Sequence, residues 1–240
     1  MKKEKVLKEV EFGLNEDGSI DWDKKMEINT IIQGDCLEVM KKMPDNSIDL
    51  VLTDPPYGIG FEYLSYEDTR ENLKKLIKEF MPEALRIGNR VAILCGITQI
   101  SLYPEPDWIM SISWNTTGSF GKYGYTQWMP VLLYGKDLKG FGNINGMTKS
   151  DIIKISGGGG VGFERSKIEK EHTCPKAITT MNKLVQRLSN ENETILDPFT
   201  GSGSTLLSAK NNNRNYIGIE ISPEYCKIAE KRLAQGVLNL

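Results

Sequence analysis

The feature of this sequence that most constrains its fold is an alternation between two kinds of apolar pattern. Short continuous apolar runs, typical of buried strands, alternate with segments in which apolar residues recur at helical spacing. The first two runs, residues 28–33 and 48–53, flank a segment that starts with Asp35 and Glu38, a pairing favoured at helix starts. Such βαβ units predict an α/β fold with a mostly parallel sheet of about seven strands and helices on both faces.

The alternation continues toward the end of the chain. Asp68 and Glu71 predict the start of a second helix, which continues through residue 84 and leads to a strand at residues 91–95. Later elements are expected at residues 178–188 (helix), 194–196 (strand), 205–210 (helix) and 215–219 (strand), followed by a last helix that begins at Ser222 and Pro223 and ends near Gly236.

The middle of the chain departs from this pattern. Residues 108–114 and 131–134 are predicted to be two antiparallel strands, and Pro130 suggests an edge or bulge position for the second. Residues 115–170 are rich in glycine, aromatic and basic residues, and we interpret them as an insert. Lys and Arg outnumber Asp and Glu between residues 136 and 187, so positive charge is concentrated there.

Length and composition exclude several classes of protein. A chain of 240 residues has an ordinary size for one α/β domain, to which we expect a charged arm at residues 1–27 to be attached. The single histidine, His172, excludes zinc sites of the H-E-x-x-H type and multi-histidine metal centres, so no metal is expected. The four cysteines are widely spaced and form no C-x-x-C pair, which indicates neither a disulfide framework nor a zinc site.

Charge and hydropathy set further limits. The net charge of −2 gives no global positive field, so nucleic-acid binding would need a local basic patch. The longest apolar stretch, residues 91–97, is far shorter than the roughly 20 residues that span a bilayer. Charged residues follow the basic start of the chain where a signal peptide needs an apolar segment, so we expect a cytoplasmic protein.

A glycine-rich string, here called the glycine turn, runs from Asp197 to Thr205 between a predicted strand and a predicted helix. Its glycines let a ligand approach the backbone at the edge of the sheet where α/β folds bind nucleotides. Glu220 ends the next strand, where a carboxylate can accept hydrogen bonds from ribose hydroxyls. A P-loop would need a following lysine, and Leu206 stands where a dinucleotide fingerprint needs its third glycine. A nucleoside pocket is predicted, with a purely structural tight turn as the alternative.

A second string, Asp54-Pro55-Pro56-Tyr57, follows the strand at residues 48–53 and is here called the Asp-Pro-Pro-Tyr motif. The prolines fix φ and donate no hydrogen bond, so the Pro55 carbonyl is held rigidly and directed outward. A rigid turn after a strand, without chemistry, is the alternative interpretation.

Together the two strings resemble the catalytic and cofactor motifs of amino-group DNA methyltransferases, which use S-adenosyl-L-methionine. The catalytic motif comes first and the cofactor glycines come last, an order that resembles the β group of this family, whose Rossmann-like sheet is circularly permuted. The resemblance implies one methyltransferase domain over residues 1–240, with DNA recognition by the insert at about 115–170. It also implies catalytic roles for Asp54, Pro55, Pro56 and Tyr57.

Two further segments are similar to family segments. Gly34-Asp35-Cys36 resembles the segment whose acid and following amide contact the adenine of the cofactor. Residues 172–176 resemble a segment that abuts the methionine end of the cofactor, although Thr173 and Ala177 stand where prolines are usual. The resemblance thus implies cofactor contacts from Asp35, Cys36, His172, Lys176, Asp197, Phe199, Gly201, Ser202, Gly203, Thr205 and Glu220.

The chemistry of these residue types agrees with the resemblance. The exocyclic amino nitrogen of adenine is a poor nucleophile because its lone pair is delocalised into the ring. Two acceptors, Asp54 and the Pro55 carbonyl, can pull it toward tetrahedral geometry and free the lone pair. Tyr57 would stack on the base, which contributes about 1–3 kcal/mol and offsets much of the free energy needed to flip the base. Attack on the methyl group would be direct, with no covalent enzyme intermediate.

The expected substrate is adenine N6 in double-stranded DNA, because serine in place of Asp54 is commoner among the cytosine enzymes of the family. Cytosine N4 is the nearest alternative, since the same geometry serves both amino groups. Three more alternatives stay open. The substrate could be RNA. The chain could also be a non-catalytic binding module on the same fold or, more distantly, a dehydrogenase. The sequence leaves open the target site, a homodimer and a cognate restriction enzyme. The residues expected to contact phosphate are Lys149, Lys154, Arg165 and Lys167.

Overall fold

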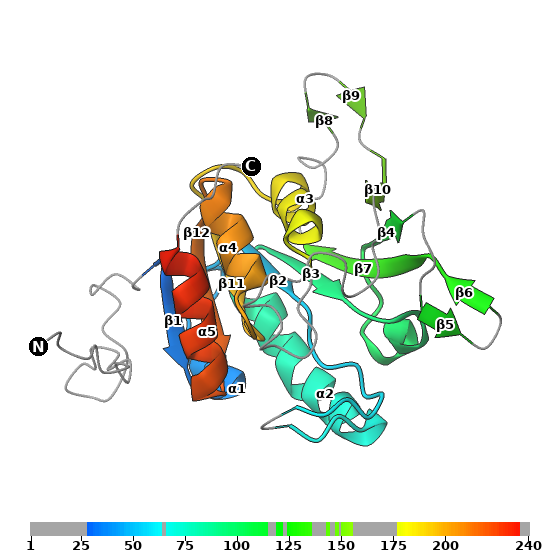
Figure 1. Cartoon of the computed structure of the whole chain (residues 1–240), viewed down its shortest axis with the longest axis horizontal. Helices are drawn as coiled ribbons and strands as arrows, with labels where there is room; N and C mark the ends of the chain where they lie inside the picture. Colours follow the sequence, from blue (N-terminus) through cyan, green and yellow to red (C-terminus); the bar gives the residue numbers. More distant parts are fainter. Residues whose placement is uncertain are drawn as a thin grey trace, which may run out of the picture.

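The computed structural model describes most of the chain (Figure 1). The expected arm at residues 1–27 and much of the expected insert lie outside the described residues. Within the described ranges, no helix combines the length and the apolar character needed to cross a bilayer. Those ranges are 28–63, 66–114, 119–121, 124–135, 143–144, 147–148, 150–155 and 177–235.

The centre of the fold is a sheet of eight strands in the order β1-β12-β11-β2-β3-β7-β4-β10 (Figure 1). All pairings are parallel except those of β7 with β3 and β4. The sequence predicts about seven strands; the eighth is β10, which falls inside the expected insert and pairs with β4 at the edge of the sheet. The strands are β1 (Thr30–Gln33), β2 (Leu50–Thr53), β3 (Arg90–Leu94), β4 (Trp108–Trp114), β7 (Trp128–Gly135), β10 (Ile152–Ile155), β11 (Thr194–Asp197) and β12 (Asn215–Glu220). Two short hairpins lie apart from it, β5 (Ser119–Gly121) with β6 (Gly124–Thr126) and β8 (Asn143–Ile144) with β9 (Met147–Thr148).

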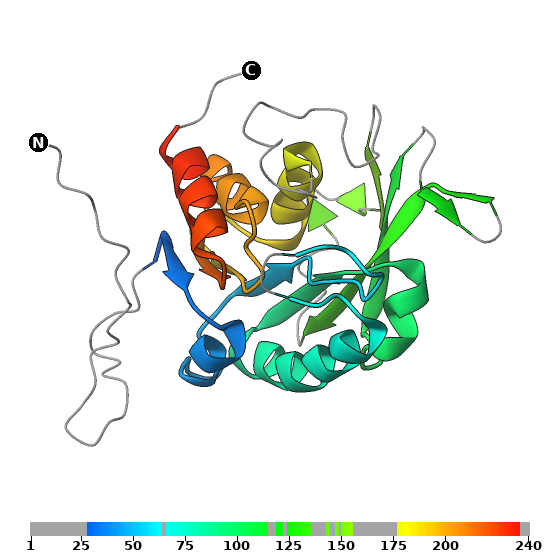
Figure 2. The same ribbon diagram turned by 60° about the horizontal axis from the view of Figure 1, so that its bottom comes forward.

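Helices cover both faces of the sheet, which confirms the expected α/β architecture (Figure 2). Side chains of β2 alternate between the two layers, because Val51 packs in the cluster that contains Phe80, whereas Leu50 and Leu52 pack in the cluster that contains Leu184. A strand buried on both faces needs a continuous apolar run, which is the pattern in the sequence. One face packs against α1 (Cys36–Lys41), α2 (Arg70–Ile87) and the 3-10 helix η1 (Ile97–Leu102), and the other against α3 (Ile178–Leu188), α4 (Ser204–Asn211) and α5 (Pro223–Ala234).

The strand order brings motifs that are distant in the sequence to one edge of the sheet. Strands β1, β12, β11 and β2 are adjacent and parallel, so their carboxyl ends lie side by side. Glu220 and Asp197 end β12 and β11, while Asp35 and Asp54 follow β1 and β2. In α/β sheets, ligands bind at this edge.

Asp68 does not begin α2, contrary to the prediction from sequence. The N-cap is Thr69, whose side chain accepts a hydrogen bond from the Asn72 backbone N–H at 3.2 Å. The Asp68 carboxylate accepts hydrogen bonds from backbone N–H groups of the loop that follows Tyr57. Because Asp and Thr are both favoured N-cap residues, local preference does not decide between two adjacent positions.

The edge or bulge position predicted from Pro130 is wrong, since the register of β7 with β4 runs unbroken through Pro130, but the antiparallel pairing of these strands is confirmed. Strand β7 lies between β3 and β4, in the interior of the sheet. The Pro130 carbonyl accepts a hydrogen bond from the Cys95 N–H at 3.4 Å, one residue beyond the end of β3. In an antiparallel pair, the N–H and C=O of one residue point toward the same neighbouring strand, which for Pro130 is β3. The N–H that Pro130 lacks would therefore lie beyond the last residue of β3, where no ladder hydrogen bond is lost.

Replacing Thr69 with alanine should lower the free energy of unfolding by about 1 kcal/mol, because the first turn of α2 loses its side-chain acceptor. Urea denaturation followed by circular dichroism measures the change. Thr69→Ser keeps a hydroxyl at this position and should retain most of the stability. An unchanged urea midpoint for Thr69→Ala would show that the cap contributes nothing.

Candidate active site

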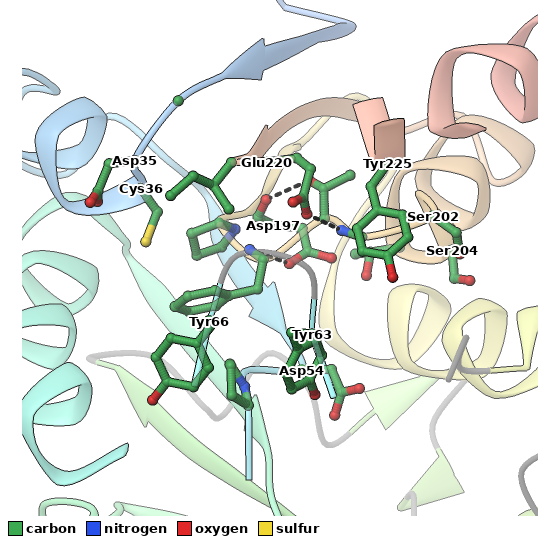
Figure 3. Close-up of a pocket in the computed structure, with 18 of the residues that line it drawn as sticks. Asp35, Cys36, Asp54, Tyr63, Tyr66, Asp197, Ser202, Ser204, Glu220 and Tyr225 are labelled. Atoms are coloured by element: carbon green, nitrogen blue, oxygen red, sulfur yellow. Dashed lines mark hydrogen bonds between the residues drawn. The ribbon is translucent and has the colours of Figure 1, made fainter. Parts of the chain in front are cut away.

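A pocket opens at the carboxyl edge of β1, β12, β11 and β2 (Figure 3). Its volume of about 380 Å³ lies within the range of sites that bind small organic ligands. Among the described residues that line it, every charged side chain is an acid, namely Asp35, Asp54, Asp197 and Glu220. The pocket therefore favours a cationic ligand and disfavours a phosphate group.

The glycine turn has a tight backbone that favours glycine at two positions. Gly201 and Gly203 have φ values of 51° and 80°, in the left-handed region. A Cβ atom on Gly203 would lie 2.9 Å from the Cβ of Ala229 on α5. Gly203 therefore allows α5 to pack closely behind the turn, while Gly201 and the neighbouring Ser202 and Thr205 line the pocket.

Arg232 of α5 is buried and is hydrogen-bonded to the glycine turn. Its Nη1 donates to the Ser202 carbonyl at 2.9 Å, to Ser202 Oγ at 2.7 Å and to Ser204 Oγ at 3.3 Å. A buried guanidinium is destabilising unless it is hydrogen-bonded, so this contact favours one conformation of the turn. Sequence reasoning missed Arg232 because it reaches the turn only through the packing of α5, and no local pattern marks it.

Glu220 is fixed at the end of β12 by two backbone hydrogen bonds. Its Oε2 accepts from the Gly201 N–H at 2.8 Å, and its Oε1 accepts from the Ser222 N–H at 2.8 Å. Burial raises the pKa of this carboxyl above its usual value. The carboxylate thus ties the glycine turn to β12, and its oxygens can accept further hydrogen bonds from a ligand.

Asp197 connects the glycine turn to the strand that carries the Asp-Pro-Pro-Tyr motif. Its Oδ1 accepts from the Thr53 hydroxyl at 2.6 Å and from the Phe199 N–H at 3.1 Å. Burial raises the pKa of Asp197 to about 6, and the nearby Asp54 carboxylate acts in the same direction. At neutral pH the side chain is therefore ionised, in a site where a cationic partner would stabilise the charge.

The Asp-Pro-Pro-Tyr motif is anchored by side chains from several elements. The Tyr57 hydroxyl donates to Asp54 Oδ1 at 2.7 Å and also contacts Met129 Sδ at 3.3 Å. Gln99 of η1 donates from Nε2 to the Tyr57 carbonyl at 2.9 Å. Asp54 and Pro56 line the pocket, and within the described part of the chain Pro55 and Tyr57 are not among the lining residues. The acid thus faces the pocket while the tyrosine hydroxyl orients it.

The start of α1 and Phe199 also line the pocket. Asp35 is the N-cap of α1 and accepts from the Leu37 N–H at 2.8 Å. Burial, reinforced by the Asp35 carboxylate, raises the pKa of the Cys36 thiol to about 12, so the thiol stays neutral. The Phe199 ring packs edge-on against Phe80 with the centroids 5.2 Å apart.

Two tyrosines that sequence reasoning missed also line the pocket. Tyr63 and Tyr66 lie in the segment between the Asp-Pro-Pro-Tyr motif and α2, and Figure 3 shows Tyr63 beside Asp54. The rings of Phe61 and Tyr63 are 4.9 Å apart, and those of Tyr63 and Tyr66 are 6.2 Å apart. The signal that could have found them is the aromatic-rich stretch directly after the motif.

Several predicted site residues are not brought into this pocket. Lys154 is exposed on β10 at the edge of the sheet, where its carbonyl accepts a hydrogen bond from Lys183 Nζ of α3 at 2.5 Å. Gly203, predicted to contact the cofactor, does not line the pocket either, because it faces Ala229 of α5. Five further predicted residues lie outside the described residues: Lys149, Arg165, Lys167, His172 and Lys176.

Comparison with known proteins agrees with this geometry. The family model described as DNA methylase matches residues 107–231, more than half of the chain. The type II methyltransferase M.HpaI of Haemophilus parainfluenzae is 30% identical over 235 residues, which cover 85% of this chain and 73% of the relative.

Two solved structures share the fold. The PvuII DNA methyltransferase, described as cytosine-N4-specific, matches with a TM-score of 0.65 at 16% identity, over 90% of this chain and 89% of the other. TTHA0409 of Thermus thermophilus, solved in complex with S-adenosyl-L-methionine, matches with a TM-score of 0.59 at 20% identity, over 88% and 95%. From the extent of the family match, the similarity to M.HpaI and the permuted order of the two motifs, the chain belongs to the β group of the N6-adenine and N4-cytosine DNA methyltransferases.

Proposed function

We propose that this DNA methyltransferase transfers a methyl group from S-adenosyl-L-methionine to the N6 amino group of adenine in double-stranded DNA, acting on a base flipped out of the duplex. The observation that carries the proposal is the meeting of the glycine turn and Asp54 in one acid-lined pocket. The hydrogen bond between Thr53 and Asp197 joins the two strands that carry these motifs.

S-adenosyl-L-methionine fits the charges and donors of this pocket. Its sulfonium and ammonium groups are cations, which suit a site whose described charged groups are all carboxylates. Of these carboxylates, Asp197 is proposed to interact with the cationic groups. Its carboxylate suits the backbone N–H groups at the start of α4. Glu220 is assigned to the ribose hydroxyls, and Asp35 with Cys36 to the adenine. Bound there, the cofactor supplies a methyl group on a positively charged sulfur.

The residues of the Asp-Pro-Pro-Tyr motif prepare the nucleophile. Asp54 and the Pro55 carbonyl accept hydrogen bonds from the amino group, which localises the lone pair on nitrogen. The Tyr57 hydroxyl orients the Asp54 carboxylate at 2.7 Å, and the anchored ring provides a surface for stacking the base.

Adenine is favoured over cytosine by the side chain at position 54. Aspartate stands where many cytosine enzymes of the family have serine. The alternative is cytosine N4, for which one structural neighbour is described as specific. The amino groups of adenine and cytosine need the same hydrogen-bond acceptors, so identification of the methylated nucleoside decides between the two substrates.

We propose that the DNA backbone is bound outside the acidic pocket. Lys154 is exposed on β10 at one edge of the sheet, and the ammonium group of Lys183 on α3 reaches the Lys154 carbonyl there. Lys149, Arg165 and Lys167 are proposed to act with them on phosphate groups. A homodimer and a cognate restriction enzyme stay predictions.

Replacing Asp54 with alanine should lower methyl transfer by at least about 100-fold, because the amino group loses its charged acceptor. The measurement is nucleoside mass spectrometry of unmethylated duplex DNA incubated with cofactor, where wild-type protein should yield N6-methyladenine. Isothermal titration should show cofactor binding retained in the variant. Wild-type activity in Asp54→Ala contradicts the assigned role, and N4-methylcytosine as the product contradicts the assigned base.

Cofactor affinity should weaken as the pH falls through about 6, the pKa of Asp197. Above this pH the carboxylate is ionised and attracts the cationic cofactor; below it the protonated group is neutral. The dissociation constant should then rise by up to about tenfold per pH unit.

Titration calorimetry between about pH 8 and about pH 5 tests this dependence. Asp197→Asn keeps an acceptor for Thr53 and should flatten the profile. Asp54 and Glu220 face the same pocket, so Glu220→Gln serves as the matched control. If the pH dependence persists in Asp197→Asn and disappears in Glu220→Gln, the titrating group is Glu220, and the role given to Asp197 is contradicted.

Lys154→Ala should reduce the salt dependence of DNA binding, with the slope of log K against log salt falling by about 0.9 if one phosphate contact is lost. Fluorescence anisotropy at a series of salt concentrations measures the slope. Lys227→Ala makes the same charge change at an exposed position of α5, at the other end of the sheet, and should leave the slope unchanged. Equal slopes for the wild-type protein, Lys154→Ala and Lys227→Ala would show that Lys154 does not contact phosphate.

A further inference from the structure

The Asp68 carboxylate binds the backbone of the loop that directly follows the Asp-Pro-Pro-Tyr motif. This post-motif loop comprises residues 58–61, and each of its four N–H groups donates to Asp68. The carboxylate accepts from Gly58 at 2.6 Å, from Ile59 at 3.0 Å and from Phe61 at 3.0 Å, and the Asp68 carbonyl accepts from Gly60 at 2.8 Å.

Two glycines allow these N–H groups to converge on one residue. Gly58 and Gly60 have φ values of 66° and 79°, in the left-handed region that other residues rarely adopt. A Cβ atom on Gly58 would also lie 3.0 Å from the Arg70 Cα, whereas one on Gly60 would meet nothing within 4 Å. At Gly60, therefore, only the backbone conformation requires glycine.

Asp68 is itself fixed to the core of the protein. It is 2% exposed, and the next residue, Thr69, caps α2, whose Leu73 is fully buried. On the other side, Gln99 donates to the Tyr57 carbonyl at 2.9 Å and is 3% exposed. The chain after Pro56 is thus held by two buried polar side chains from different elements.

We propose that Asp68 is a positioning residue for methyl transfer, which acts by fixing the post-motif loop and, through it, the placement of Asp54 and Tyr57. It does not line the pocket, so it acts through the loop and not on the substrate. The proposal rests on the catalytic role proposed for Asp54. It predicts a loss of turnover that is separate from any loss of cofactor binding, since residues 58–61 do not line the pocket, and the glycine turn and Glu220 hold most of the cofactor side from other strands.

The test compares Asp68→Asn with the wild-type protein in single-turnover methyl transfer at saturating cofactor and DNA. An asparagine amide brings N–H donors to a position where three backbone donors converge, and it removes the charge that strengthens these bonds. The expected loss of rate is between about tenfold and about 100-fold, the size associated with small misplacements of reacting groups. The cofactor dissociation constant from titration calorimetry should stay unchanged.

Two further variants separate positioning from stability. Gly60→Ala strains the same loop without touching the carboxylate, so it should lower the rate as Asp68→Asn does and also leave cofactor binding unchanged. Thr69→Ala removes the adjacent helix cap, so it should lower the melting temperature but not the rate. If Asp68→Asn does not fold, the comparison of Gly60→Ala with Thr69→Ala carries the test.

A normal rate in Asp68→Asn or, where that variant does not fold, in Gly60→Ala would overturn the proposal. An equal loss in rate and in cofactor affinity would also overturn it, because a merely structural defect lowers both. Asp54→Ala is measured in parallel. If it is inactive while Asp68→Asn is normal, the positioning role alone fails; if it is fully active, the proposed function of the motif fails and the positioning role fails with it.

Discussion

The buried hydrogen bond from Thr53 to Asp197, 2.6 Å long, is the contact on which the site depends. It joins the carboxyl ends of β2 and β11, which are adjacent in the sheet but distant in the sequence. The parallel register of these strands, with Leu50 opposite Ile195, brings the Asp-Pro-Pro-Tyr motif and the glycine turn to the same edge. A change in this register would separate the two motifs, since side chains at strand ends move with the strand.

Each motif is then held by buried polar side chains from elsewhere in the chain. Arg232 and Glu220 fix the glycine turn, while Asp68 and Gln99 fix the segment after Pro56. Burying such groups is destabilising unless their hydrogen bonds are made, so each contact favours one geometry over its alternatives. The pocket is therefore shaped on both sides before a ligand enters, which reduces the free energy needed to organise it on binding.

Local sequence patterns predicted seven of the eight strands of the central sheet and both motifs, because these depend on interactions within a short segment. Arg232 and Gln99 had no such signal, because they reach the site only through the packing of α5 and η1. The errors have the same physical origin. Asp68 and Thr69 are both good N-cap residues, and only the tertiary contact with the post-motif loop distinguishes them. Pro130 suggested an edge strand, because its sequence context does not reveal that β3 ends before the position of its missing N–H.

The charge of the pocket also constrains how DNA must be bound. Four carboxylates line a cavity of about 380 Å³ in a chain whose net charge is −2, so a phosphate group is repelled from it. On the proposed function, the base must enter while its flanking phosphates stay outside, and cations elsewhere must hold the backbone. The Lys183 ammonium group reaches the Lys154 carbonyl where β10 extends the sheet, at the end opposite β1. On the same proposal, β10, the strand beyond the expected seven, provides an edge where phosphates bind at a distance from the acids that line the pocket.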